Sequence, residues 1–133
     1  MAILSDKARA FLNEKRFAVL ATLNEDGSVQ QTTMWYLLEG DTIVMNTKAG
    51  RVKDRNLRRN PHISICLEGG YHYLTISGNV ELIEDQATAQ HDIYRLAVRY
   101  DGEESATRQM AEQFSKEQRV TIHLKPERII ENF

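Results

Sequence analysis

The sequence predicts a mostly β domain with flanking helices, in which an antiparallel sheet curls into a small barrel. Short apolar or alternating runs of strand length recur along the 133 residues, and tight-turn signals separate many of them. Helical spacing of apolar residues is confined to the segments between these runs. A content of 41% hydrophobic and 27% charged residues is typical of one globular unit, so we expect a single domain over residues 1–133.

The chain begins with a predicted helix. Ser5 is a suitable N-cap, and the helix is expected to run to about Lys15. Ala8, Phe11 and Leu12 fall on one face at helical spacing, so this face should pack on the sheet.

Three strands are predicted next, over residues 17–23, 29–38 and 42–47. The turn signals Glu25–Ser28 and Glu39–Asp41 separate them. Because tight turns cannot connect parallel neighbours, these strands should form an antiparallel meander.

The second half alternates helices and strands. A basic helix should end at Asn60, because proline at the next position disfavours helix in the residue before it. Gly78 is expected to mark a bulge or bend inside a long strand. The remaining predicted elements are strands over 62–68, 71–83 and 119–126 and helices over 85–100 and 104–116, which makes about six strands in all.

Several classes of protein are disfavoured by composition. The single cysteine, Cys66, lies in the apolar run ISICL, which predicts a buried and inert thiol. Four scattered histidines without a CxxC or HExxH pattern predict no metal site. No apolar run reaches the roughly 18 to 20 residues that span a bilayer, and no signal peptide is recognisable, so we expect a cytoplasmic protein without a membrane partner.

The segment over residues 47–61 concentrates positive charge in a chain whose net charge is -2. Its cations are Lys48, Arg51, Lys53, Arg55, Arg58 and Arg59. Two of them, Arg51 and Lys53, lie in the first turn of the predicted helix, where free amides and the helix dipole attract an anion. With the Thr47 hydroxyl beside them, they predict a phosphate site; a solvated charged helix face is the alternative.

Four sequence blocks then resemble a known family. FAVLATLNEDGSVQQTTMWY, IVMNT, GRVKDRNLRRNPHISICL and YLTISGNVELI, in this order, resemble the flavin-binding split-barrel family related to pyridoxamine phosphate oxidase. They are most similar to its branch that uses the deazaflavin coenzyme F420. The resemblance implies a six-stranded antiparallel split β-barrel, a homodimer, and cofactor grooves between the two subunits.

The resemblance also implies which residues bind the cofactor. Lys53 matches the family's phosphate-binding lysine, Arg51 an arginine beside it, and Asn46 and Thr47 a pair at a strand end. Trp35 belongs to the strand that borders the flavin ring, although a partly buried core aromatic is the alternative from sequence alone. The candidate cofactor-binding residues are Thr32, Thr33, Met34, Trp35, Asn46, Thr47, Lys48, Arg51, Lys53 and Asn56.

The implied function is an oxidoreductase that binds F420 at a dimer interface and transfers hydride to an unsaturated small molecule. An FMN-dependent oxidoreductase and a non-catalytic flavin- or F420-binding protein are the alternatives. The C-terminal LKPERIIENF lacks the arginine-rich motif of true pyridoxamine phosphate oxidases, so vitamin B6 oxidation is disfavoured. No acid–base pair stands out in the sequence, which is compatible with an oxidoreductase because a flavin carries the hydride chemistry and the protein mainly binds and orients it. The slightly acidic net charge of -2 argues against a nucleic-acid partner.

Overall fold

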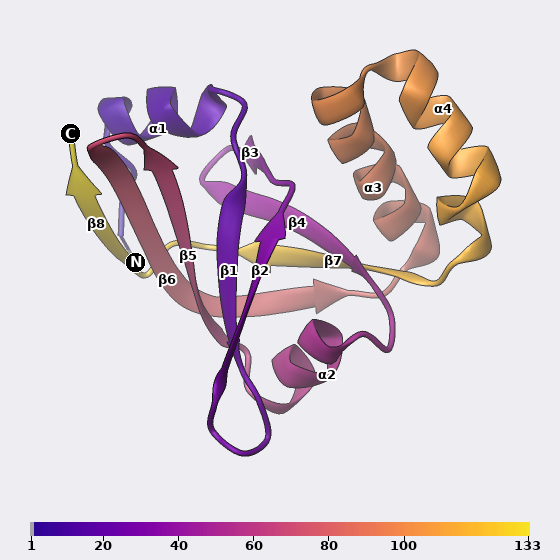
Figure 1. Ribbon diagram of the computed structural model, residues 1–133, viewed down its shortest axis with the longest axis horizontal. Coiled ribbons are helices and arrows are strands. Elements are labelled where there is room, and N and C mark those ends of the chain that lie inside the picture. Colours follow the sequence, from indigo (N-terminus) through magenta and orange to yellow (C-terminus); the bar gives the residue numbers. More distant parts are fainter. Residues whose placement is uncertain (1) are drawn as a thin grey trace.

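The computed structural model describes residues 2–133 and has eight strands and four α-helices in that range. The strands are β1 (Ala18–Leu23), β2 (Val29–Met34), β3 (Leu37–Glu39), β4 (Thr42–Lys48), β5 (His62–Gly69), β6 (His72–Ile83), β7 (Arg119–Leu124) and β8 (Arg128–Asn132). The helices are α1 (Asp6–Asn13), α2 (Val52–Arg59), α3 (Gln86–Asp101) and α4 (Glu103–Glu112), and a 3₁₀ turn over Phe114–Lys116 follows α4. Figure 1 shows the strands curling around a common centre, with α1 at one end and the α3–α4 pair to one side.

The strands form one curled antiparallel sheet with the order β2-β1-β5-β6-β7-β4-β3, and β8 pairs with β6 outside this path. This half-barrel with flanking helices confirms the predicted fold class. The path holds seven strands rather than the expected six, because the predicted strand over 29–38 divides at Trp35 and Tyr36 into β2 and β3. The pairing of β8 with β6 is a further strand contact that the sequence did not indicate.

The long strand β6 connects the two parts of the sheet. It pairs with β5 as far as Asn79 and with β7 from Val80 onward. The register with β5 is continuous through Gly78, so this glycine marks a bend rather than a bulge. A Cβ at Gly78 would lie 2.9 Å from the carbonyl oxygen of Lys125, so the close approach of this backbone requires glycine.

The barrel core is built by alternate residues of the paired strands. Leu20, Ile65 and Ile76 lie side by side in register and are at most 1% exposed. Their neighbour Cys66 is exposed, so the prediction of a buried thiol is wrong. Because side chains alternate along a strand, Cys66 lies on the outer face while Ile65 lies in the core.

The helices lie close to their predicted positions. The amide of Ala8 donates to the Ser5 hydroxyl at 3.0 Å, which confirms the predicted N-cap of α1. The carboxylate of Asp85 caps α3 by accepting from the amide of Thr88 at 3.1 Å. Within residues 2–133, none of the helices has the length and apolar character needed to cross a bilayer.

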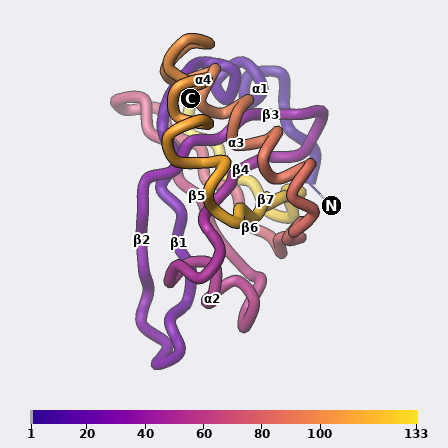
Figure 2. Tube along the Cα trace, turned by 90° about the vertical axis from the view of Figure 1, so that its right-hand side faces the viewer, coloured from indigo at the N-terminus to yellow at the C-terminus, as the bar shows by residue number. Residues whose placement is uncertain are grey.

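The β1–β2 hairpin and α2 project together beyond the barrel. Figures 1 and 2 both show the hairpin tip past the other strands, with α2 beside it. Asn56 Nδ2 of α2 donates to Thr22 Oγ1 of β1 at 3.1 Å. The amide of Ala49 donates to the carbonyl oxygen of Gln118 at 2.8 Å. The first contact holds α2 on β1, and the second holds the segment before α2 next to the start of β7.

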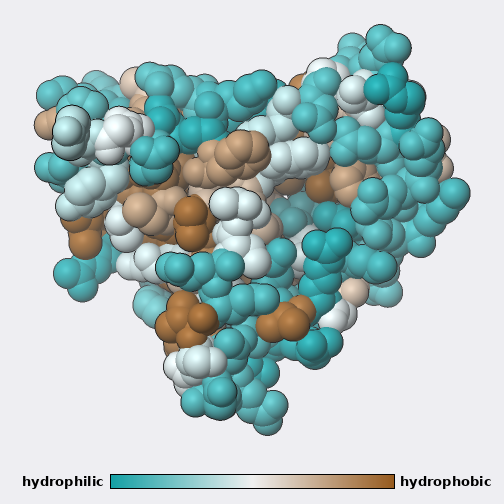
Figure 3. Space-filling view, in the orientation of Figure 1, coloured by the Kyte–Doolittle hydropathy of each residue, from teal (hydrophilic) through white to brown (hydrophobic). Residues whose placement is uncertain are grey.

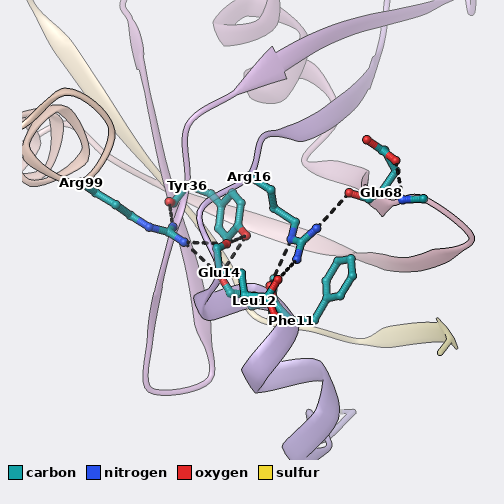
Figure 4. A network of polar contacts seen from close by, with 8 residues as sticks. Phe11, Leu12, Glu14, Arg16, Tyr36, Glu68 and Arg99 are labelled. Carbon is teal, nitrogen blue, oxygen red and sulfur yellow. Dashed lines mark hydrogen bonds and ion pairs between the residues drawn. The ribbon is translucent and has the colours of Figure 1, made fainter.

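A polar network holds the junction between β2 and β3 against α1 and α3 (Figure 4). Arg99 of α3 donates to the carbonyl oxygens of Tyr36 and Leu12, the second at 3.0 Å. The Tyr36 hydroxyl also donates to the Leu12 carbonyl oxygen, at 2.9 Å. Tyr36 is fully buried, so the backbone next to Trp35 is fixed in place.

Candidate cofactor site

A hollow of about 210 Å³ lies where the ends of β2 and β4 meet the start of α2, the middle of α3 and the start of β7. Seven of the ten candidate residues line it: Thr33, Met34, Trp35, Asn46, Thr47, Arg51 and Lys53. Residues from segments distant in sequence therefore meet at one place, although a binding role for them stays a prediction.

The other three candidates lie outside this hollow. Thr32 lines a shallow neighbouring depression together with Arg51 and Arg55. Lys48 is exposed and pairs with Glu117 at 3.6 Å. Asn56 is 3% exposed and holds α2 on β1 through its amide. The position of Asn56 thus accounts for its burial without a ligand.

The start of α2 lacks a capping side chain. Arg51 is the N-cap residue and makes no side-chain cap. The preceding Gly50 has φ +88°, which a residue with a side chain would adopt only under strain, and its amide donates to Asp54 Oδ2 at 2.8 Å. The uncapped first turn and its dipole are favourable for a bound anion.

Two cations at this helix start have no counter-charge. Within residues 2–133 neither Arg51 nor Lys53 takes part in an ion pair. Lys53 is only 8% exposed, and burial, followed by repulsion from Arg51 and Arg119, lowers the pKa of its ammonium group. A buried cation without a partner is unfavourable, so an anionic ligand would relieve this cost.

The other cations of the basic segment are occupied elsewhere. Arg58 pairs with Asp54 at 3.0 Å and with Glu84 at 2.9 Å. Arg55 donates to the carbonyl oxygen of Gly50 at 2.7 Å. Among the six basic residues of this segment, the hollow is lined by Arg51 and Lys53.

A third cation, Arg119 at the start of β7, also lines the hollow. It is 5% exposed, and its Nε donates to Asn46 Oδ1 at 3.0 Å while Nη1 donates to Glu117 Oε1 at 2.8 Å. Burial lowers the pKa of its guanidinium group, and Glu117 opposes that shift. Sequence reasoning missed Arg119, because its approach to the site depends on the pairing of β7 with β4.

Part of the lining is apolar and aromatic. Trp35 stacks on Tyr100 with ring centroids 5.3 Å apart and planes inclined by 8°. Ile93, Leu96 and Phe114 also line the hollow. A ligand with an anionic group and a flat apolar part would match both kinds of lining.

One buried hydroxyl group of the lining is left without a hydrogen-bond partner among the described residues. Thr47 Oγ1 is buried and makes no hydrogen bond within the described part of the chain. Buried hydroxyl groups in proteins are nearly always hydrogen-bonded, so this atom fits a site that a ligand completes. The lining holds no histidine or carboxylate among the described residues, and residues 2–133 contain no cluster of metal-ligating side chains.

The fold and sequence are similar to those of solved structures. A conserved hypothetical protein of Mycobacterium tuberculosis has a TM-score of 0.80 and 27% identity, over 97% of this chain and 84% of that one. An F420 reductase has a TM-score of 0.73 and 26% identity, over 92% and 94% of the two chains. The heme storage protein HutZ of Vibrio cholerae shares the fold at a TM-score of 0.72 and 19% identity, over 99% and 97%.

The match to a family model decides the family. The model described as pyridoxamine 5'-phosphate oxidase matches residues 4–133, which is nearly the whole chain. The predicted resemblance is thereby confirmed, and the chain belongs to the pyridoxamine 5'-phosphate oxidase family.

Proposed function

We propose that the protein is an oxidoreductase that binds coenzyme F420 in this hollow and uses it to reduce an unsaturated small molecule. The observation that carries the proposal is that Arg51 and Lys53, which have no ion pair within residues 2–133, line one hollow together with aromatic side chains. F420 combines a phosphodiester with a planar ring, so its two parts match the cationic and the aromatic lining. When bound, it would supply the hydride.

The residues of this chain would bind and orient the cofactor. Lys53, Arg51 and the first amides of α2 would hold the phosphate, and the free Thr47 hydroxyl would add a hydrogen bond. Trp35, held in place by Tyr100, would cover the apolar area of the ring. Because the lining has no carboxylate or histidine in the described range, the substrate proton would come from solvent or from a partner subunit.

FMN is the alternative cofactor, since the same cations would bind its phosphate. The solved F420 reductase, at 26% identity, favours the deazaflavin. A non-catalytic cofactor-binding protein is the second candidate function, supported by the absence of acid–base side chains from the lining within residues 2–133.

We also propose that the protein acts as a homodimer. A hollow of about 210 Å³ is small for a cofactor, since pockets for small molecules usually measure about 300 to 1,000 Å³. A second copy would supply the missing walls.

The outer face of the sheet carries exposed apolar residues, namely Phe17, Leu23, Val29, Tyr73 and Ile130. Apolar residues also gather over the central strands on the face in Figure 3, and such patches are typical of interfaces.

Spectroscopic titration with F420, FMN and riboflavin tests the cofactor proposal. We expect F420 to bind most tightly and FMN more tightly than riboflavin, because the cations of the hollow contact phosphate. Equal affinity for FMN and riboflavin, with no binding of F420, would contradict the phosphate site.

Sedimentation of the Cys66→Arg variant tests the dimer. Cys66 lies in register between Val19 and Thr75 on the outer face, so a charge there would be buried at the interface. We expect a monomer with greatly weakened cofactor binding. The matched control is Glu81→Arg, at an exposed position of β6 away from Cys66. A wild-type monomer that binds F420 tightly would contradict the dimer.

A further inference from the structure

A chain of buried hydrogen bonds runs from α3 to the hollow through β7 and β4. Thr121 Oγ1 lies 2.7 Å from Asp92 Oδ2, and Asn46 Nδ2 lies 3.2 Å from Thr121 Oγ1. Asn46 Oδ1 lies 3.0 Å from Arg119 Nε. The four side chains are between 0% and 6% exposed. The chain thus joins a buried acid to the cation that lines the hollow.

The chemistry of the groups fixes the direction of each bond. Arg119 Nε can only donate, so the Asn46 atom that it contacts must be the amide oxygen. Asn46 Nδ2 therefore donates, both to Thr121 Oγ1 and to the carbonyl oxygen of Ala89 at 2.9 Å. Thr121 uses its own proton toward the Asp92 carboxylate. The donors and acceptors along this series of hydrogen bonds are therefore consistent, with the two hydrogens of Asn46 Nδ2 going to two different acceptors.

Arg119 is held on several sides, and part of its guanidinium remains free. Nη1 donates to Glu117, and the guanidinium carbon lies 5.0 Å from the centre of the Phe114 ring. Within residues 2–133, Nη2 has no acceptor at hydrogen-bond distance. A cation that is fixed in advance loses little freedom when a ligand binds.

We propose that Asp92, Thr121 and Asn46 form a relay that positions Arg119 as an anion-binding residue of the hollow that Arg51 and Lys53 also line. This inference rests on the proposed function, because it assigns a third contact for the same phosphate group. Arg119 binds the anion directly. Asp92 and Thr121 act through it and are positioning residues.

One observation and one general argument favour this role over a purely structural one. Arg51, Lys53 and Arg119 line one hollow, and their mutual repulsion is part of what lowers the pKa of Lys53. Buried polar networks also seldom stabilise a fold better than apolar packing would. An anion in the hollow would offset the repulsion and use the free Nη2 group.

The probe for the test is inorganic phosphate, followed through the Arg119 Nε–H resonance in NMR spectra of the full-length protein. The signal is assigned by its absence from Arg119→Lys. We compare wild type with Thr121→Val, which removes the hydroxyl at nearly constant shape, and with Thr121→Ser, which retains it. Circular dichroism checks that each variant is folded.

We expect phosphate to shift the Nε–H resonance and to bind Thr121→Val about tenfold more weakly, with affinity restored in Thr121→Ser. Arg119→Lys keeps the charge but cannot donate from Nε, so it should weaken phosphate binding to the extent expected for Thr121→Val. This second variant tests the role of Arg119 even if Thr121→Val does not fold. Unchanged phosphate affinity in the folded variants, or no response of the resonance, would overturn the relay. Titration with F420 and FMN decides the cofactor separately, so a phosphate response without cofactor binding would leave the relay supported and refute the proposed function.

Discussion

Two groups of cations in this molecule differ in how fully they are bonded. Beside α1, Arg16 and Arg99 donate to backbone carbonyl oxygens, with Arg16 Nη1 3.1 Å from the Glu68 oxygen and Arg99 Nη2 3.0 Å from the Leu12 oxygen. Beside α2, Arg51 and Lys53 have no ion pair within residues 2–133, and both line a hollow. The first group therefore completes the fold, and the second is the group that we propose binds a ligand.

The difference shows why charge density in a sequence is a weak guide to function. All six cations over residues 47–61 look alike by composition, yet Arg58 is neutralised by Asp54 and Glu84. Contacts distinguish Arg58, whose charge is neutralised within the chain, from Arg51 and Lys53, which have no ion pair within residues 2–133.

The largest expected effect is on the bonded group. Replacing Arg99 with Ala removes its bonds to the Tyr36 and Leu12 carbonyl oxygens and its position 4.6 Å over the Tyr36 ring. We expect the free energy of unfolding to fall by about 2 to 3 kcal/mol, measured by urea denaturation. Arg108→Ala is the control, because Arg108 is exposed and pairs only weakly, with Glu104 at 3.4 Å. Equal losses of unfolding free energy in both variants would contradict the distinction between the two groups of cations.

The next largest effect is expected on cofactor affinity, when a cation of the second group, Arg51 and Lys53, is replaced. Lys53→Ala should weaken cofactor binding by about 1.5 to 3 kcal/mol, because it removes a charge-assisted contact in a partly desolvated site. Arg59→Ala is the matched control on the same helix, since Arg59 donates to Asn56 Oδ1 at 2.8 Å and does not line the hollow. Calorimetric titration with F420 measures both. Equal losses would indicate a diffuse positive patch, and no loss for Lys53→Ala would indicate a solvated helix face.

A smaller effect should distinguish the two cofactors. F420 has an acidic tail beyond its phosphodiester, and Arg55 lies in the depression next to the hollow. Arg55→Gln should weaken F420 binding about threefold at low salt and leave FMN binding unchanged. Titrations at two ionic strengths measure the difference. An equal loss of affinity for both cofactors would mean that Arg55 does not contact the tail.

Much of the fold could be predicted from local patterns. The Ser5 N-cap, the end of α2 before Pro61 and the alternating strands follow from nearest neighbours in sequence. The prediction for Cys66 is wrong because it treats ISICL as one apolar run, although only the alternate residues Ile63, Ile65 and Leu67 are buried. The division at Trp35 and Tyr36 depends on bonds to Arg99 and Tyr100, more than sixty positions away.

The candidate site could be predicted only where its residues leave a local signal in the sequence or match the family. The α2 cations and Thr47 were predicted from charge and spacing, and the resemblance added Trp35 and Asn46. Arg119 could not be found in this way, because its partner Asn46 is 73 positions away and the two meet through the pairing of β4 with β7. Residues that act through long-range pairing leave no local signal.

The smallest expected effect concerns the stability of the protein without cofactor. Burial and two neighbouring cations lower the pKa of Lys53 from 10.5 in the folded state. The unfolded chain therefore holds this proton more tightly, so the charged form of Lys53 destabilises the fold below its folded pKa. The free energy of unfolding then rises as the pH increases from the folded pKa toward 10.5.

Replacing Lys53 with Met keeps the aliphatic length and removes the charge. At neutral pH this variant should be more stable than wild type by about 0.5 kcal/mol, and the gain should disappear at alkaline pH, where wild-type Lys53 is neutral. Urea denaturation of both proteins across this pH range measures the difference, and saturating F420 should reverse it at neutral pH, because only the charged lysine holds the phosphate. A Lys53→Met variant less stable than wild type at neutral pH would mean that Lys53 has an acceptor within the fold and belongs with Arg16 and Arg99.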